Sequence, residues 1–105
     1  MRTFPKSLAI FRQIVEERGE RLRRMSFEEL KQLRTAPIEH LTIDSRPATI
    51  AIIVLDSEDC RLEVVVQGFM NARLLPVKNV ALDGFYKHAN GSVTPLADSE
   101  FYKFD

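Results

Sequence analysis

Hydrophobic residues recur with the period of an α-helix in the first part of the chain. On a helical wheel they form one stripe about 120° wide, which contains Leu8, Phe11, Ile14, Val15, Leu22 and Met25. The stripe predicts an amphipathic helix over residues 7–24. Pro5 suits the approach to a helix, where a missing N–H is harmless. Gly19 costs about 1 kcal/mol in a helix interior relative to alanine, so we expect the helix to bend or fray there.

A second, shorter helix follows with a sharper start. Ser26 and Glu29 have the spacing of a capping box, in which the hydroxyl and the carboxylate each accept a backbone N–H at the helix start. An apolar side is formed by Phe27, Leu30 and Leu33. Pro37 disfavours helical geometry at the residue before it, so we expect this helix to end near Arg34.

From residue 37 onward the pattern is that of strands and turns. Residues 41–44 are a short strand candidate. Residues 49–55 are nearly continuous in apolar side chains, which is typical of a central strand covered on both faces, or on one face with an oligomer contact on the other. Residues 61–67 alternate between polar and apolar, as in a half-buried strand. Gly68 is expected to end that strand or to mark a bulge.

The last third contains a long strand and a hairpin. Residues 77–88 predict a strand that bends at Asp83-Gly84. Asn90-Gly91 accepts the positive φ angles of a type I′ turn and therefore predicts a tight hairpin. That turn would place His88 opposite Val93.

The segment after the hairpin is short and ends in aromatic residues. Pro95 cannot donate a ladder hydrogen bond, so the last strand should lie at a sheet edge. Asp98 is placed to cap a final helical turn. The aromatic side chains of this turn are Phe101, Tyr102 and Phe104.

Consecutive hairpins without intervening helices imply an antiparallel meander. We therefore predict an α+β fold, with two N-terminal helices packed on one face of an antiparallel meander sheet of about five strands. Length favours a single domain over residues 1–105, helical over 1–36 and rich in strands over 37–105.

Charge changes sign at the same boundary. Residues 1–36 carry nine basic and five acidic side chains, whereas residues 37–105 carry six basic and ten acidic ones, so a net charge of zero hides two opposite parts. Hydrophobic residues at 45% and charged residues at 29% are ordinary globular values, which excludes a disordered chain.

Four arginines cluster near the end of the first predicted helix: Arg18, Arg21, Arg23 and Arg24. Such a cluster is one way to bind a phosphate backbone. Glutamates four residues before Arg21 and Arg24 explain most of it by helix stability instead, and no nucleic-acid reading motif is present. Arg18 lies within the apolar stripe. It either extends past the edge of the stripe to solvent or reaches a carboxylate of the strand part.

Candidate catalytic and metal-binding residues are isolated in the sequence. Cys60 follows two acidic residues, which disfavour a thiolate. His40 and His88 lack the spacing of metal ligands, and the four glycines are too scattered for a phosphate loop. We expect no catalytic residue, no cofactor and no metal site. An enzyme of unknown class, whose histidines and carboxylates converge in a cleft, is kept as an alternative.

The expected location is the cytoplasm, without membrane attachment. The apolar run at residues 8–11 is too short for a signal peptide or a membrane span. A single cysteine does not require an oxidising compartment.

Apolar surface in the strand part points to protein contacts. Residues 49–55 offer apolar side chains to both sheet faces, while two short helices cover only one. We therefore expect a small non-catalytic binding or regulatory protein that acts through protein–protein contacts or self-association, such as a homodimer. A nucleic-acid-binding module that uses the basic helical part is the first alternative. The candidate interaction residues are Arg18, Phe101, Tyr102 and Phe104.

Overall fold

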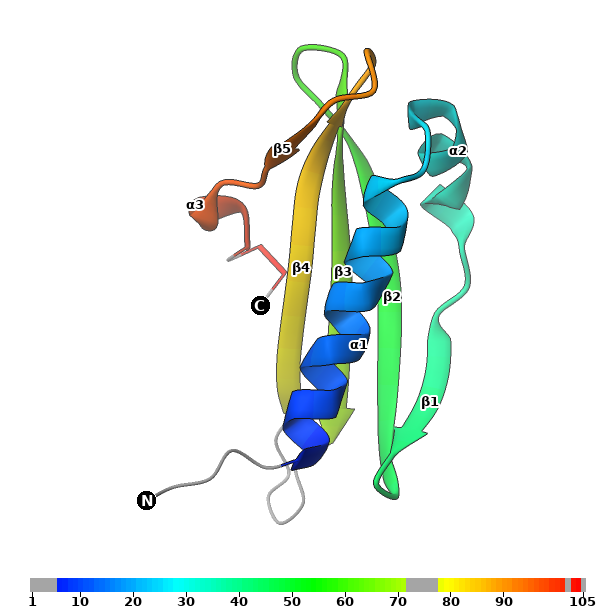
Figure 1. Cartoon of the computed structure of the whole chain (residues 1–105), viewed down its shortest axis with the longest axis vertical. Helices are drawn as coiled ribbons and strands as arrows, with labels where there is room; N and C mark the ends of the chain where they lie inside the picture. The colour runs from blue at the N-terminus through cyan, green and yellow to red at the C-terminus, as the bar shows by residue number, and fades with distance from the viewer. Residues whose placement is uncertain (1–5, 72–77, 102, 105) are drawn as a thin grey trace.

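The computed structural model describes residues 6–71, 78–101 and 103–104. Its elements are the helices α1 (Lys6–Arg23) and α2 (Phe27–Lys31), the 3₁₀ helix η1 (Gln32–Thr35), the strands β1 (Glu39–Ile43), β2 (Arg46–Ser57), β3 (Arg61–Asn71), β4 (Lys78–His88) and β5 (Val93–Pro95), and the helix α3 (Asp98–Phe101). The strands form one antiparallel sheet in chain order, and α1 lies across one face of it (Figure 1). The predicted α+β meander is confirmed.

The first helix uses the predicted apolar stripe. Phe11, Val15 and Leu22 are buried against the sheet. The helix runs through Gly19 to Arg23 as one element, so it does not fray there. The reason is packing, because a Cβ atom on Gly19 would lie 1.8 Å from Oδ2 of Asp83 on β4. Gly19 therefore marks a close approach of α1 to β4.

The predicted capping box starts α2. The Ser26 hydroxyl accepts the Glu29 N–H at 3.1 Å, and Oε1 of Glu29 accepts the Ser26 N–H at 3.0 Å. The hydrogen bond from the Ser26 backbone lowers the pKa of Glu29. Helical structure ends at Thr35, one residue after the predicted end, and Ala36 is extended before the proline.

β3 continues through Gly68, contrary to the expected end or bulge. Gly68 pairs in regular register with Ile50 on β2 and Ala81 on β4. A Cβ atom at Gly68 would lie 2.8 Å from Val15 and 2.9 Å from the Phe11 ring. The glycine therefore makes room for α1 above the sheet, which is the other use of glycine within a strand.

β4 is likewise one strand through Asp83-Gly84, and the hairpin after it is longer than predicted. Gly91 N–H donates to the His88 carbonyl at 2.9 Å, and His88 N–H donates to the Ser92 carbonyl at 2.9 Å. Gly91 has φ +93°, whereas Asn90 does not have positive φ, so the loop is not a type I′ turn. The Asn90 side chain accepts the Ser92 N–H at 2.9 Å and so stabilises the longer, three-residue form of loop.

The longer loop shifts the register of β5 by one residue. Lys87, not His88, lies opposite Val93. As predicted, β5 is an edge strand, and it ends with Pro95.

Two apolar clusters cover the two faces of the sheet. The larger one lies under the helices and includes Phe11, Val15, Leu22, Leu30, Ile50, Leu62, Val64 and Phe85. The smaller one lies on the opposite face, where Val65, Tyr86 and Leu96 pack with half-buried Ile53, Leu82, Phe101 and Phe104. The C-terminal segment thus supplies part of the cover that the apolar run in β2 requires.

Candidate interaction surface at the outer edge of β4

β4 is longer than the strand that covers its outer side. β5 pairs only with Phe85–Lys87, and within the described residues no strand lies on the outer side of β4, opposite β3, from Lys78 to Gly84. Figure 1 shows this part of β4 at the border of the sheet, with α1 crossing in front. We call Lys78–Gly84 the β4 edge.

Alternate residues of the β4 edge direct their backbone groups outward. In an antiparallel ladder the N–H and C=O of one residue point to the same neighbouring strand, and successive residues alternate. His88 N–H bonds to Ser92 on the β5 side, whereas Ala89 N–H bonds to Cys60 on the β3 side. Counting back in steps of two from His88, the outward residues are Lys78, Val80, Leu82 and Gly84. Gly84 already donates its N–H to Asp83 Oδ1 at 3.0 Å, which leaves the first three as the main pairing positions. Outward N–H and C=O groups of this kind form a template for another strand.

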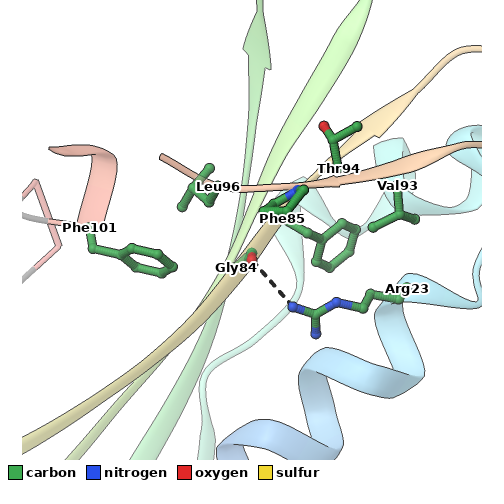
Figure 2. Close-up of a pocket in the computed structure, with 8 residues that line it drawn as sticks. Arg23, Gly84, Phe85, Val93, Thr94, Leu96 and Phe101 are labelled. Carbon is green, nitrogen blue, oxygen red and sulfur yellow. Dashed lines mark hydrogen bonds between the residues drawn. The ribbon is translucent and has the colours of Figure 1, made fainter. Parts of the chain in front are cut away.

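Two hollows flank the β4 edge. One of about 260 Å³ lies between α1 and β4 and is lined by Arg12, Val15, Glu16, Val80, Ala81 and Leu82. The other, of about 330 Å³, lies at Gly84, where β5 leaves the sheet. Figure 2 shows Phe101 and Leu96 on one side of the β4 ribbon there, and Arg23 and Val93 on the other. Side chains of an added strand would alternate between the two faces and meet these hollows.

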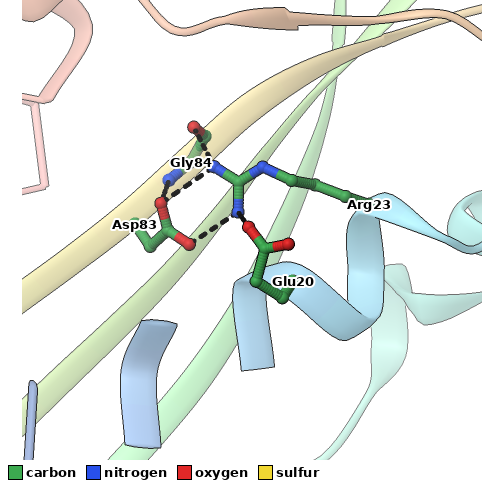
Figure 3. Close-up of polar contacts among 4 residues, drawn as sticks. All are labelled: Glu20, Arg23, Asp83 and Gly84. Atoms are coloured by element: carbon green, nitrogen blue, oxygen red, sulfur yellow. Dashed lines mark hydrogen bonds and ion pairs between the residues drawn. The ribbon is translucent and has the colours of Figure 1, made fainter. Parts of the chain in front are cut away.

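An ion pair between α1 and β4 holds the upper end of the β4 edge in place. Arg23 donates from Nη1 to Oδ2 of Asp83 at 2.7 Å and from Nη2 to Oδ1 at 3.0 Å (Figure 3). Nη2 also donates to the Gly84 carbonyl at 3.3 Å, and the guanidinium lies 4.9 Å from the centroid of the Phe85 ring. The hydrogen bonds to Asp83 raise the pKa of Arg23. The wall formed by α1 is therefore joined to the strand it borders by an ion pair with two hydrogen bonds.

On the opposite face, the C-terminal segment covers a cluster of charged side chains. Glu63 is buried, at 5% exposure, and burial together with a hydrogen bond to Glu100 raises its pKa. A hydrogen bond from Lys103 lowers the pKa of Glu100. Beside them, the Arg61 guanidinium stacks 3.9 Å from the centroid of the Tyr86 ring. An open cleft of about 630 Å³ adjoins these groups.

The predicted interaction residues lie in two separate places. Arg18 reaches the strand part, donating from Nε and Nη2 to the Glu39 carboxylate on β1 at 3.1 and 2.7 Å. Phe101 and Phe104 come together on the opposite sheet face, where Gln67 Nε2 donates to the Phe104 carbonyl at 2.6 Å. Tyr102 lies outside the described residues. Arg18 is thus a link between α1 and β1, and the two phenylalanines belong to the apolar cover of the sheet.

The histidines and the cysteine stay apart. His88 Nε2 lies 2.8 Å from the Thr94 hydroxyl on β5, and His40 is exposed on β1. Cys60 is exposed in the turn between β2 and β3, with φ +54°. Among the described residues, no group of three His, Cys, Asp or Glu side chains has the arrangement of a metal site. None of the described helices has the length and apolarity to cross a membrane.

Sequence reasoning missed the ion pair of Arg23 and the outer edge of β4. A signal for the first was present, because Gly19 stands one helical turn before Arg23 and Asp83-Gly84 interrupts an apolar strand pattern. The second had no local signal, since it depends on where β5 stops along β4.

Comparisons of the chain with protein-family models, with curated proteins and with solved structures find no match.

Proposed function

We propose that the chain is a small non-catalytic protein-binding module whose partner adds a β-strand along the β4 edge. The observation that carries this proposal is the stretch Lys78–Gly84, whose outward backbone groups face no strand within the described residues. Strand addition uses main-chain hydrogen bonds for affinity and side-chain hollows for specificity. The β4 edge offers both, with α1 as one wall and the C-terminal segment as the other.

Other outer parts of the sheet are better protected against strand addition. β5 is short and ends in Pro95, which blunts its edge. The outer side of β2 beyond β1 has η1 packed beside it, and Arg34 of η1 forms an ion pair with Asp56 on β2. Along the β4 edge the described residues place no strand on the outer side, and Phe101 and Phe104 of the C-terminal segment pack in the same apolar cluster as Leu82.

The arginines supply no specific support for the nucleic-acid alternative. Arg18, Arg23 and Arg34 each hold a carboxylate of the strand part, on Glu39, Asp83 and Asp56 respectively. Three arginines of the helical part therefore have a structural role, because they join the helices to the sheet.

We also propose that the module works in the cytoplasm. Its single cysteine, Cys60, is exposed, and an exposed free thiol suits a reducing compartment.

The test is a proline substitution at an outward position. Val80→Pro removes an outward N–H and no hydrogen bond to β3, so the fold should tolerate it, whereas strand addition should be lost. Thr42→Pro is the matched control, because Thr42 points outward in the same way on the opposite edge strand, β1.

The readout is amide hydrogen exchange in the presence of an occupant, either a second copy at high concentration or peptides selected from a displayed library. We expect added protection of the Val80 and Leu82 amides in the wild type and in Thr42→Pro, and loss of occupant binding in Val80→Pro. Exposed exchange rates at both amides under every condition would contradict the proposal.

A further inference from the structure

We propose that the occupant of the β4 edge is the β4 edge of a second copy of this chain, so that two sheets join around a two-fold axis at Ala81. This inference rests on the proposed function, because it identifies the strand that is added. In a two-fold antiparallel pairing around Ala81, Val80 lies opposite Leu82 of the second copy and Lys78 lies opposite Gly84. Val80 and Leu82 then form hydrogen-bonded pairs on both sides of the axis. Gly84, at the end of the pairing, already donates its N–H to Asp83 Oδ1 at 3.0 Å and accepts from Arg23 Nη2 at 3.3 Å, so the central residues carry the ladder.

The residue at the two-fold axis suits this position. Ala81 would face itself in a pair without direct hydrogen bonds, where Cα atoms approach to about 4.5 Å and side chains are closest. The N–H and C=O of Ala81 point inward to β3. Placing Ala81 on the axis therefore leaves no backbone group of this residue without its hydrogen bond in the sheet. The small methyl side chain, on the face below α1, leaves room for its copy.

The position of α1 also agrees with a second copy. α1 packs over both β3 and β4. With strands about 4.8 Å apart, a helix above the midline of β3 and β4 lies about 10 Å from its copy across the axis. Packed helices have interaxial distances of about 8–10 Å. The two copies of α1 would therefore pack side by side above the joined sheet, and the C-terminal segments would remain on the other face.

Charges on α1 are complementary to themselves across this axis. Arg12 and Glu16 lie one helical turn apart and line the hollow beside Val80, Ala81 and Leu82. The two-fold axis reverses the direction of the second helix, so Arg12 of each copy faces Glu16 of the other. Arg12 already interacts within its own chain, and the second copy adds to that contact. The two-fold pairing thus brings opposite charges together and avoids contacts between like charges, which are strongly disfavoured across an interface. This favours a second copy of the chain as the partner.

The test exploits the reversal of charge. Arg12→Glu gives each copy two acidic groups at the contact, and Glu16→Arg gives each copy two basic groups. Each variant alone should self-associate about tenfold or more weakly than the wild type. An equimolar mixture of the two variants should associate at least as well as the wild type, because every contact across the axis then joins opposite charges. Arg21→Glu, an exposed change of the same kind on the other side of α1, is the matched control and should leave association unchanged.

The measurement is sedimentation velocity on the full chain from micromolar to millimolar concentrations, with circular dichroism to confirm that each variant is folded. Val80→Pro provides a second, charge-independent variant that should be monomeric. A mixture of Arg12→Glu and Glu16→Arg that stays monomeric, or a dimer that withstands Val80→Pro, would overturn the two-fold pairing. A wild type that is monomeric throughout but gains protection at Val80 and Leu82 with a selected peptide would overturn the pairing and leave the proposed function standing. Absence of both self-association and peptide binding would overturn both.

Discussion

Arg23 at the end of α1 and Asp83 in the middle of β4 form a two-point ion pair, with N···O distances of 2.7 and 3.0 Å. The pair is half-buried and is completed by the Gly84 carbonyl and by contact with the Phe85 ring. It can form only because Gly19 has no side chain at the point where the Asp83 carboxylate meets the helix. One glycine, one arginine and one aspartate thus set how α1 lies on the sheet and define one wall of the β4 edge.

Gly19→Ala tests this arrangement directly. The added Cβ would lie 1.8 Å from Oδ2 of Asp83, so the carboxylate must turn away from Arg23. We expect a net loss of about 1–2 kcal/mol in the free energy of unfolding, although alanine favours the helix by about 1 kcal/mol. Urea unfolding measures this. Ala9→Gly, at an exposed helical position, should show the propensity effect alone, and a stabilised Gly19→Ala would show that the close approach has no energetic consequence.

Removing charge from the two ion pairs of α1 should have unequal effects. Asp83→Asn weakens the partly buried pair with Arg23 and should lower the free energy of unfolding by about 1–2 kcal/mol. Glu39→Gln weakens the more exposed pair with Arg18, where we expect less than about 1 kcal/mol. Thermal or urea unfolding of both variants provides the comparison. Equal losses would mean that burial does not distinguish the two pairs.

Gly68→Ala should destabilise the fold by overpacking. Its Cβ would lie 2.8 Å from Val15 and 2.9 Å from the Phe11 ring, both of which are buried. We expect a loss of about 1–3 kcal/mol in urea unfolding. Phe11→Leu vacates part of this space, so the double variant should be more stable than the sum of the single losses predicts. Strict additivity of the two changes would argue that Gly68 and Phe11 are not in tight contact.

The Glu63 carboxyl should make stability fall as pH rises. Burial and the hydrogen bond to Glu100 raise the pKa of Glu63, so the folded protein holds a proton that the unfolded chain releases near the ordinary value of glutamate. Its contribution is fully present below that ordinary value and is lost as pH increases through the raised pKa. Glu63→Gln should therefore be more stable than the wild type at neutral pH, with the difference vanishing in acid.

Urea unfolding between acid and neutral pH measures this dependence. Glu100→Gln is the informative control, because it removes the carboxylate partner while burial of Glu63 remains. It should reduce the pH dependence without abolishing it. An unchanged profile in Glu63→Gln would assign the dependence to other groups.

A disulfide at the proposed two-fold axis should form between two copies. Ala81→Cys in a Cys60→Ser background places two thiols opposite each other, with Cα atoms about 4.5 Å apart, inside the range of about 4.4–6.8 Å that a disulfide requires. Mild oxidation followed by non-reducing electrophoresis should show a covalent dimer. Thr42→Cys in the same background, on the opposite sheet edge, should stay monomeric. Equal cross-linking of both variants would indicate random collision.

Much of the fold could be predicted because it depends on neighbours in the chain. The capping box of Ser26 and Glu29 acts within one helical turn, and Pro95 marks an edge strand because of its own missing N–H. The hairpin at Asn90-Gly91 was predicted as a hairpin but with the wrong turn. The Asn90 side chain favours a longer loop, and one added loop residue shifts every partner in β5.

The sequence by itself determined the order and kind of the elements, since local periodicity and turn residues specify them. Only the tertiary structure decided the roles of two glycines and one arginine, because each contacts a residue that is distant in the chain. Gly19 lies against Asp83, and Gly68 lies against Phe11. Arg18 donates hydrogen bonds to Glu39. Judged from its neighbours in the chain, a glycine inside a helix or strand lowers the stability of that element. In the folded molecule, Gly19 and Gly68 lie where the helix and the sheet pack closely. The outer edge of β4, the site of the proposed function, likewise exists because β5 pairs with only part of β4, and no local pattern encodes the mismatch in length between two paired strands.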